Sequence, residues 1–228
     1  MKDVLIPLGL IVFIGFFIIA VIHAARKQRK AKIRVFRDFA DKKGLRYQEE
    51  DDGNAQRFAQ DFDGIGRFSS PSLGKVIPKD VVNGKLDGSE AILFRHSIRL
   101  SEGWAREWYV AGVTSAETIA KRCAVQFCKG KADKRSMYLQ DPVVKEKKIG
   151  SFNLVVRAED SSSAGKVFNE NILKLLADIA GNLSFRPEIQ VRGNRIVAYL
   201  ADRNATVDDV ETLENLFEFA NNTVRALG

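Results

Sequence analysis

A long uncharged segment lies near the N-terminus of the chain. Residues 4–22 read VLIPLGLIVFIGFFIIAVI and contain no charged side chain. A helix of this length covers roughly 28 Å, close to the thickness of the hydrocarbon core of a bilayer. A buried core helix would carry polar residues on one face, and a cleaved signal peptide would have its charges before a shorter apolar run. The segment therefore predicts a retained transmembrane anchor over residues 1–25 that contacts the lipid bilayer through residues 4–22.

The positive charge of the chain is concentrated around and after this segment. Residues 1–37 hold eight basic residues and one acidic residue, which accounts for the whole formal net charge of +7. Because basic flanks stay on the cytoplasmic side, we expect a single-pass protein of the inner (plasma) membrane, with its N-terminus outside and its C-terminal domain cytoplasmic. A nucleic-acid-binding domain would spread Lys and Arg over a folded face, so no nucleic-acid partner is expected.

Residues 26–44 are predicted to form a basic juxtamembrane stalk helix that continues the membrane helix. Apolar residues keep helical spacing through AKIRVFRDFADKK, and Gly44 follows where a left-handed C-terminal cap is expected. The basic residues have two interpretations. They contact anionic lipid headgroups, worth about 1 kcal/mol per well-placed Lys or Arg, or they only set the topology. The candidate lipid-contact residues are Arg26, Lys27, Arg29, Lys30, Lys32 and Arg34.

Residues 45–228 are predicted to form a soluble α+β domain. A short strand is expected at LRYQ and a short helix at NAQRFAQDF, and further strands at DVVNGKL, EAILFRHSI, REWYVAGV, KRCAVQFC, SMYLQ, FNLVVRAE and both halves of RPEIQVRGNRIVAYLAD. Asp87-Gly88 and Gly193-Asn194 are typical hairpin turns. Amphipathic helices are expected over residues 163–182 and 206–227, the second with Thr206 as its N-cap.

This arrangement predicts a mainly antiparallel sheet with helices packed on one side, because the helices are segregated from the strands rather than alternating with them. Residues 45–150 and 151–228 share a rough order of strand, helix and hairpin, which leaves two similar halves as a further interpretation.

The order of these segments resembles a set of uncharacterised bacterial single-pass membrane-anchored proteins with one cytoplasmic α+β domain. The resemblance rests on the N-terminal span, the basic stalk, VNGKLDGSEAILF, the strand led by Phe152, and IQVRGNRIVAYL before the closing helix. These motifs mark turns and core positions, so the resemblance implies a bacterial inner-membrane location and no activity, substrate or catalytic residue.

Residues able to carry chemistry are sparse in the sequence. Cys123 and Cys128 are too few for a structural zinc site, and on one strand they would face opposite sides as free thiols. His96 shares its face with apolar residues, and no partner for it is evident. No nucleophile elbow or phosphate-binding loop occurs. We therefore predict no catalytic, cofactor-binding or metal-binding residues. The sequence favours a non-enzymatic protein and leaves an enzyme as the open alternative.

An interaction surface is the hypothesis for Trp104, Arg106 and Trp108, which would share one face of a strand and have the composition of interface hot spots. The alternative is that the tryptophans cover a sheet face against a helix. The leading hypothesis is a membrane-tethered, non-enzymatic protein-interaction or scaffold domain with a membrane or membrane-proximal protein partner. The alternative is a membrane-anchored enzyme or small-ligand sensor whose site forms no linear motif.

Overall fold

The computed structural model describes residues 2–62, 78–86, 88–99, 105–129, 141–200 and 209–227, with residues 2–12, 97–99, 105–106, 129 and 163 as backbone only. The helices are α1 (Lys2–Lys43), α2 (Asn54–Ala59), α3 (Ser161–Val167), α4 (Glu170–Gly181) and α5 (Val210–Leu227). The strands are β1 (Arg46–Glu50), β2 (Pro78–Leu86), β3 (Ser89–Arg99), β4 (Ala105–Thr114), β5 (Ala120–Lys129), β6 (Val143–Ile149), β7 (Phe152–Ala158), β8 (Pro187–Gly193) and β9 (Arg195–Leu200).

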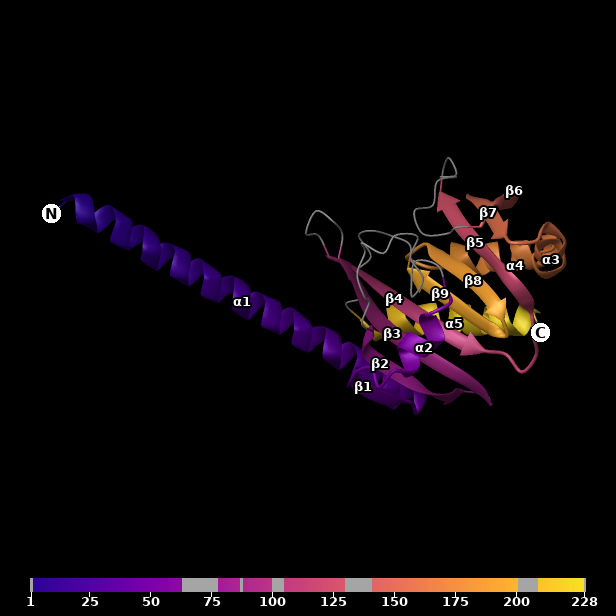
Figure 1. Ribbon diagram of the computed structural model, residues 1–228, viewed down its shortest axis with the longest axis horizontal. Helices are drawn as coiled ribbons and strands as arrows, with labels where there is room; N and C mark the ends of the chain where they lie inside the picture. The colour runs from indigo at the N-terminus through magenta and orange to yellow at the C-terminus, as the bar shows by residue number, and fades with distance from the viewer. Residues whose placement is uncertain are drawn as a thin grey trace.

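The strands form one nine-stranded sheet in the order β1-β2-β3-β4-β9-β8-β5-β7-β6 (Figure 1). Every neighbouring pair is antiparallel. The α+β class and the antiparallel sheet predicted from the sequence are therefore confirmed. Strands from 45–150 and 151–228 interleave, because β9 pairs with β4 and β5 lies between β8 and β7.

Two apolar clusters cover the two faces of this sheet. The larger one joins residues such as Leu93 and Val125 to the C-terminal part of α1 and to α3, α4 and α5. The smaller one joins Ile92 and Val110 to α2 and Phe62. Leu93 and Ile92 adjoin on β3 and so face opposite sides. The prediction that all helices pack on one side of the sheet is therefore wrong for α2, which packs on the face opposite to the other helices.

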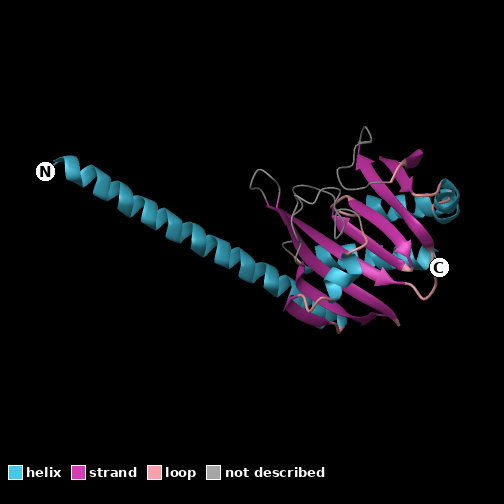
Figure 2. Ribbon diagram, in the orientation of Figure 1, coloured by secondary structure: helices cyan, strands magenta, loops and turns pink. Residues whose placement is uncertain are grey.

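A single helix connects the predicted membrane segment to the domain. α1 runs from Lys2 to Lys43 without interruption and extends away from the sheet (Figure 2), which agrees with the continuous helix predicted from the sequence. Gly44 ends it with a left-handed φ of 65°, and the backbone N–H of Leu45 donates to the Ala40 carbonyl at 2.8 Å. Among the described side chains, which in α1 begin at Phe13, no helix is long and apolar enough to cross a membrane.

Some local features differ from the sequence predictions, and two of the predictions lie outside the described residues. The helix expected over 163–182 is two helices, because the chain turns at the buried Phe168 and the Asn169 side chain caps α4 by accepting the Ile172 N–H at 3.1 Å. β6 was not predicted from VVKEKKI. The strand expected at SMYLQ and the Thr206 cap lie outside the described residues, and Asp209 accepts the N–H of Thr212 at 2.7 Å at the start of α5.

Candidate functional site

The stalk junction, where the C-terminal part of α1 meets the sheet and α5, connects the stalk to the domain. Phe36 and Phe39 are fully buried there. The Phe36 ring stacks on Tyr109 of β4 with centroids 6.2 Å apart, and Phe39 meets Phe217 of α5 edge-on at 5.7 Å. Such pairs add to the free energy gained from burying the rings. The last turns of the stalk are thus part of the domain core.

Beside these rings lies a buried ion pair between neighbouring strands. Arg95 of β3 donates from Nε and Nη2 to Oδ2 of Asp80 at 2.8 and 2.6 Å. Asp80, 1% exposed, adopts a left-handed φ of 51° where the β2–β3 register shifts. The Tyr47 hydroxyl of β1 donates to the other carboxylate oxygen at 2.9 Å. Burial and the nearby Asp80 charge raise the pKa of Tyr47, which keeps its hydroxyl a donor.

Glu107 of β4 extends this network to the stalk. It accepts a hydrogen bond from Nη1 of Arg95 at 2.7 Å, another from the Tyr109 hydroxyl at 3.2 Å, and an ion-paired one from Lys32 of α1. Burial would raise the pKa of the Glu107 carboxyl, but the Lys32 hydrogen bond and the charges of Arg95 and Lys32 outweigh it, so its pKa is lowered. Glu107 therefore stays ionised and links the stalk to the sheet.

The six basic residues singled out in the stalk divide into two groups. Arg29 pairs with Glu49 at 2.6 Å, Lys32 pairs with Glu107, and Arg34 pairs along the helix with Asp38 at 3.5 Å. The other three form no ion pair with any residue that the structure describes, and they are exposed: Arg26, Lys27 and Lys30. Two of the six therefore bind the domain, while three remain available to another anionic surface.

Of the three residues predicted to form an interaction surface, only Trp108 has a described side chain, and its position differs from that prediction. Trp108 is buried, with 6% exposure, and it stacks on Tyr199 of β9 with centroids 5.2 Å apart. This corrects the expectation of an exposed tryptophan at position 108 and agrees with the alternative, a tryptophan covering the sheet face. Trp104 and the side chain of Arg106 lie outside the described residues.

His96 lies on the same face as Trp108, between that ring and Phe94, with centroids 5.9 and 6.2 Å away. It is 1% exposed, and neither ring nitrogen has a hydrogen-bond partner among the described atoms. Burial lowers the pKa of His96 to about 3, so the ring is neutral at physiological pH. Among the residues that the structure describes, none orients this imidazole for acid–base work.

A half-buried carboxyl, that of Glu188 on β8, lies on the same face and pairs in register with Tyr199 of β9. The Tyr199 hydroxyl donates to Glu188 of β8, and Gln126 of β5 donates to the same side chain at 3.1 Å. Burial raises the pKa of Glu188 despite these hydrogen bonds and the charge of Arg157. The side chains of Tyr199, Gln126 and Glu188 thus form hydrogen bonds with one another, and we interpret them as a structural part of the sheet.

The two cysteines are not joined in a disulfide and occupy opposite faces of β5, as their spacing predicted. Cys123 belongs to the larger apolar cluster, and burial followed by the Asp141 charge raises the pKa of its thiol to about 12. Cys128 is half-buried. Within the described ranges, no group of three or more His, Cys, Asp or Glu side chains is placed to hold a metal ion.

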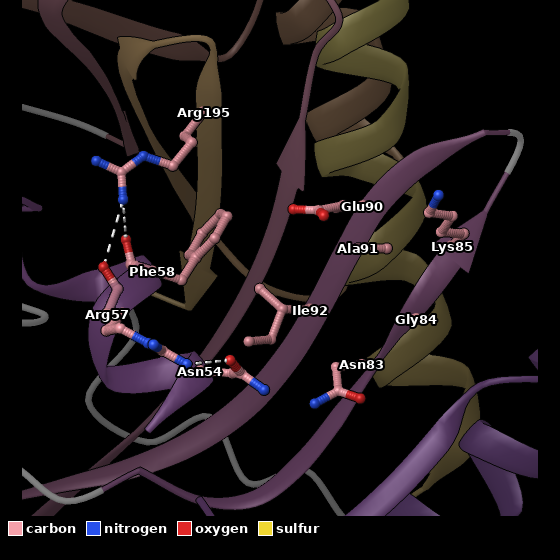
Figure 3. A pocket seen from close by; sticks show the side chains of 10 residues that line it. All are labelled: Asn54, Arg57, Phe58, Asn83, Gly84, Lys85, Glu90, Ala91, Ile92 and Arg195. Carbon is pink, nitrogen blue, oxygen red and sulfur yellow. Dashed lines mark hydrogen bonds between the residues drawn. The ribbon is translucent and has the colours of Figure 1, made fainter. Parts of the chain in front are cut away.

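A pocket of about 480 Å³ lies between α2 and the strands β2, β3 and β9 (Figure 3). Its lining residues are Asn54, Arg57, Phe58, Asn83, Gly84, Lys85, Glu90, Ala91, Ile92 and Arg195. Sequence reasoning did not find this pocket or the ion pairs of the stalk junction. The lining residues come from segments up to 141 positions apart, and no spacing within one segment signals their assembly.

Comparison with known proteins adds information on the fold. No protein-family model matches the chain, and no curated protein does. Among solved structures, the chain is similar to the crystal structure of the mycobacterial trehalose monomycolate transport factor A, TtfA, with a TM-score of 0.53 and 16% sequence identity. The match covers 86% of this chain and 96% of that chain. At this identity the likeness shows a shared fold.

Proposed function

We propose that the protein is a single-pass, membrane-tethered and non-enzymatic interaction module, whose domain is held close to the bilayer by a rigid stalk. One observation carries this proposal: α1 exposes large apolar side chains all round before it enters the domain core. Phe13, Phe16, Phe17 and Ile19 are each more than 60% exposed. An exposed apolar surface of this kind requires a covering partner. These side chains belong to the uncharged segment 4–22, whose length matches the hydrocarbon core of a bilayer, so we infer that the bilayer covers them.

The charge distribution supports a cytoplasmic domain. Arg26, Lys27 and Lys30 follow the apolar segment within about two turns and form no ion pair within the described residues. Unpaired cations at this position retain one end of a span on the cytoplasmic side. The proposed location is therefore a bacterial inner membrane, which also fits the resemblance to single-pass bacterial proteins.

A rigid stalk gives the proposed module a defined position. From Ile22 to Phe36 the helix rises roughly 20 Å, and Phe36, Phe39 and the Lys32–Glu107 pair fix its other end on the sheet. A domain tethered in this way meets a neighbouring membrane protein at high effective concentration and in a restricted orientation. The structurally similar TtfA is named a transport factor, and an accessory role beside a membrane protein is what we propose for this chain.

In-cell crosslinking of the tagged full chain, followed by mass spectrometry, tests the proposal. A chain of residues 1–37 serves as the control for contacts made by the span alone. A second variant carries a flexible Ser-Gly-Gly-Ser-Gly insertion between Ala31 and Lys32, which keeps the domain at the membrane but separates it from the rigid stalk. We expect one membrane protein at near-stoichiometric yield with the full chain, none with residues 1–37, and a reduced yield with the insertion. Equal capture by the full chain and by residues 1–37 would overturn the proposal.

The pocket beside α2 favours a second candidate function, a membrane-anchored sensor of a small ligand. Its volume of about 480 Å³ falls within the range typical of small-molecule sites. In that case the purified full chain would gain thermal stability from a metabolite in the absence of any protein partner. A screen of metabolites by thermal unfolding tests this second candidate, because a metabolite that binds only the folded domain raises its unfolding temperature.

A further inference from the structure

The pocket beside α2 is formed by residues that the register of the sheet places on one face. Asn83 pairs with Ile92 and Lys85 with Glu90 across β2 and β3, while Arg195 of β9 lies opposite Thr114 at the end of β4. α2 supplies the remaining wall through Asn54, Arg57 and Phe58. Figure 3 shows these side chains around a common space. The pocket thus lies entirely within the domain and does not depend on the proposed membrane tether.

Gly112 of β4 has no side chain, and this allows the Phe58 ring to form part of the apolar surface of the pocket. A Cβ atom at Gly112 would lie 2.3 Å from Cε1 of Phe58 and 2.9 Å from Cγ2 of Ile92. Phe58 therefore lies directly against the backbone of β4, next to Ile92. Both side chains line the pocket and offer an apolar surface to a bound molecule.

One of the pocket's cations is already neutralised. Arg195 donates from Nη2 to Asp61 at 2.5 Å and from Nη1 to the carbonyl oxygen of Phe58 at 2.8 Å. Its guanidinium also lies 5.7 Å from the centre of the Phe58 ring. Arg195 holds α2 on the sheet in this way, and its charge is used within the fold.

The other two cations form no ion pair among the described residues, although the pKa of the nearby Asp52 carboxyl is lowered by its hydrogen bond from the Asn54 backbone N–H and, among smaller causes, by the charge of Arg57. Arg57 donates only to neutral oxygens, to Asn54 Oδ1 at 2.7 Å and to the Gly53 carbonyl at 3.3 Å. Lys85 and Glu90 are register partners on adjacent strands, yet no ion pair joins them. The pocket therefore presents two cations, one carboxylate and the amides of Asn54 and Asn83 beside an apolar surface.

We propose that this pocket binds a small organic anion from aqueous solution, with its carboxylate or phosphate group held by Arg57 and the amides of Asn54 and Asn83 and its apolar part on Phe58 and Ile92. Lys85 adds positive charge at the other end of the pocket (Figure 3). Two positive charges against one negative charge favour an anion, and guanidinium and amide donors match its oxygens. β4 points away from the N-terminal part of α1, and the pocket lies toward that end of the strand (Figure 1). The predicted membrane surface is on the other side, so the ligand comes from solution.

The proposal is tested by isothermal titration calorimetry on the full chain in nanodiscs of neutral lipid. The probes share one phenyl group and differ in charge: phenylacetate, phenyl phosphate, neutral phenylacetamide and cationic 2-phenylethylammonium. We expect the two anions to bind at least about tenfold more tightly than the amide, since a charged hydrogen bond is lost with it. We expect the cation to bind least. Equal affinity for phenylacetate and phenylacetamide, preference for the cation, or no binding of either anion would overturn the proposal.

Variants locate the binding and separate it from damage to the fold. Arg57→Gln should weaken phenylacetate binding at least about tenfold, and Lys85→Gln should weaken it less because Lys85 lies at the other end of the pocket from Arg57 (Figure 3). Glu90→Gln should tighten binding, a gain that a disturbed fold would not produce. Lys174→Gln, an exposed substitution on α4, is the matched control and should change nothing. Equal effects of Arg57→Gln and Lys174→Gln would overturn the assignment to this pocket. A loss of phenylacetate affinity in nanodiscs with anionic lipid would overturn the soluble source and indicate a lipid headgroup as the occupant.

Discussion

Arg95 and Asp80 form an ion pair between neighbouring strands in which both contacting nitrogens donate to the same carboxylate oxygen, at 2.6 and 2.8 Å. The Asp80 carboxylate is 1% exposed and the Arg95 side chain 11% exposed. Because Arg95 also contacts Glu107, which binds Lys32 of the stalk, this pair connects β2 to the helix that leads to the proposed membrane span. The stability of the stalk junction should therefore depend on Asp80.

Asp80→Ala is expected to reduce the free energy of unfolding by about 3–5 kcal/mol, because it leaves the charge of Arg95 buried without its main partner. Asp80→Asn should cost less, since an amide keeps an acceptor for Tyr47 and tolerates the left-handed φ of 51°. The measurement is urea unfolding of the full chain in detergent, followed by tryptophan fluorescence. Asp38→Ala, which removes the exposed pair with Arg34, is the control and should cost below about 0.5 kcal/mol. A similar cost for the two alanine variants would contradict the role assigned to Asp80.

The stalk should also be part of the cooperative unit that unfolds. Phe39 is fully buried against Phe217, so Phe39→Ala is expected to cost about 3–5 kcal/mol. Leu175→Ala on α4, where the side chain is 44% exposed, is the control and should cost much less. Urea unfolding followed by tryptophan fluorescence measures both, and Trp108 belongs to the apolar cluster on the opposite face of the sheet from Phe39. An unchanged midpoint for Phe39→Ala would mean that the stalk is not coupled to the domain.

Local features of the fold were predictable because they depend on neighbouring residues. Gly44 ends α1, and Gly193 turns β8 into β9 with a φ of 61°, as the glycine positions indicated. Long-range pairing was not predictable in this way. The adjacency of β4 to β9, and of β5 to both β7 and β8, joins segments with similar alternation. Nothing in a single strand's pattern selects its partner from several strands of equal period.

The candidate sites were less predictable than the fold for the same reason. Lys32 and Glu107 are 75 positions apart, and Arg57 and Arg195 are further apart still. Each of these charged residues looks like ordinary solvated surface in the sequence. The division of the stalk into paired and unpaired cations also depends on acidic residues of β1 and β4, which only the folded arrangement places beside the helix. Trp108 shows the converse case: its aromatic character indicated a possible interaction surface, but it is buried against Tyr199, which is far away in the sequence and lies on the neighbouring strand β9.

The division of the stalk leads to a prediction about lipids. Replacing Arg26, Lys27 and Lys30 together by Gln should reduce the enrichment of anionic lipid around the full chain at least about tenfold, because each contributes roughly 1 kcal/mol near a membrane surface. Replacing Arg29, Lys32 and Arg34 by Gln removes the same charge from residues already paired with carboxylates. This matched triple should change lipid enrichment less and domain stability more.

Energy transfer from tryptophan to a labelled anionic lipid in nanodiscs measures the enrichment, and urea unfolding measures the stability. Equal loss of enrichment in the two triple variants would show that the ion pairs do not divide the stalk. In that case lipid contact would follow total charge alone.

His96 should make the stability of the domain depend on pH. Its pKa is about 3 in the folded chain and about 6.5 when exposed. Between these values the unfolded chain binds a proton that the folded chain does not bind, so the free energy of unfolding falls as the pH drops from about 6.5 toward 3. The slope from this one group approaches about 1.4 kcal/mol per pH unit, and above pH 6.5 it vanishes.

His96→Leu removes this proton and the two unpartnered ring nitrogens. We expect the variant to be at least as stable as the wild type at pH 7.5, and its advantage to grow by about 2–3 kcal/mol as the pH falls to 4.5. Carboxyl groups of ordinary pKa titrate in the same range, so the informative quantity is the difference between variant and wild type at each pH. His23→Leu, at an exposed position on α1, is the matched control and should leave the difference flat. Urea unfolding at pH 7.5, 6.0, 5.0 and 4.5 provides the measurement, and a flat difference for His96→Leu would mean that the buried ring finds a partner for its proton in the folded chain.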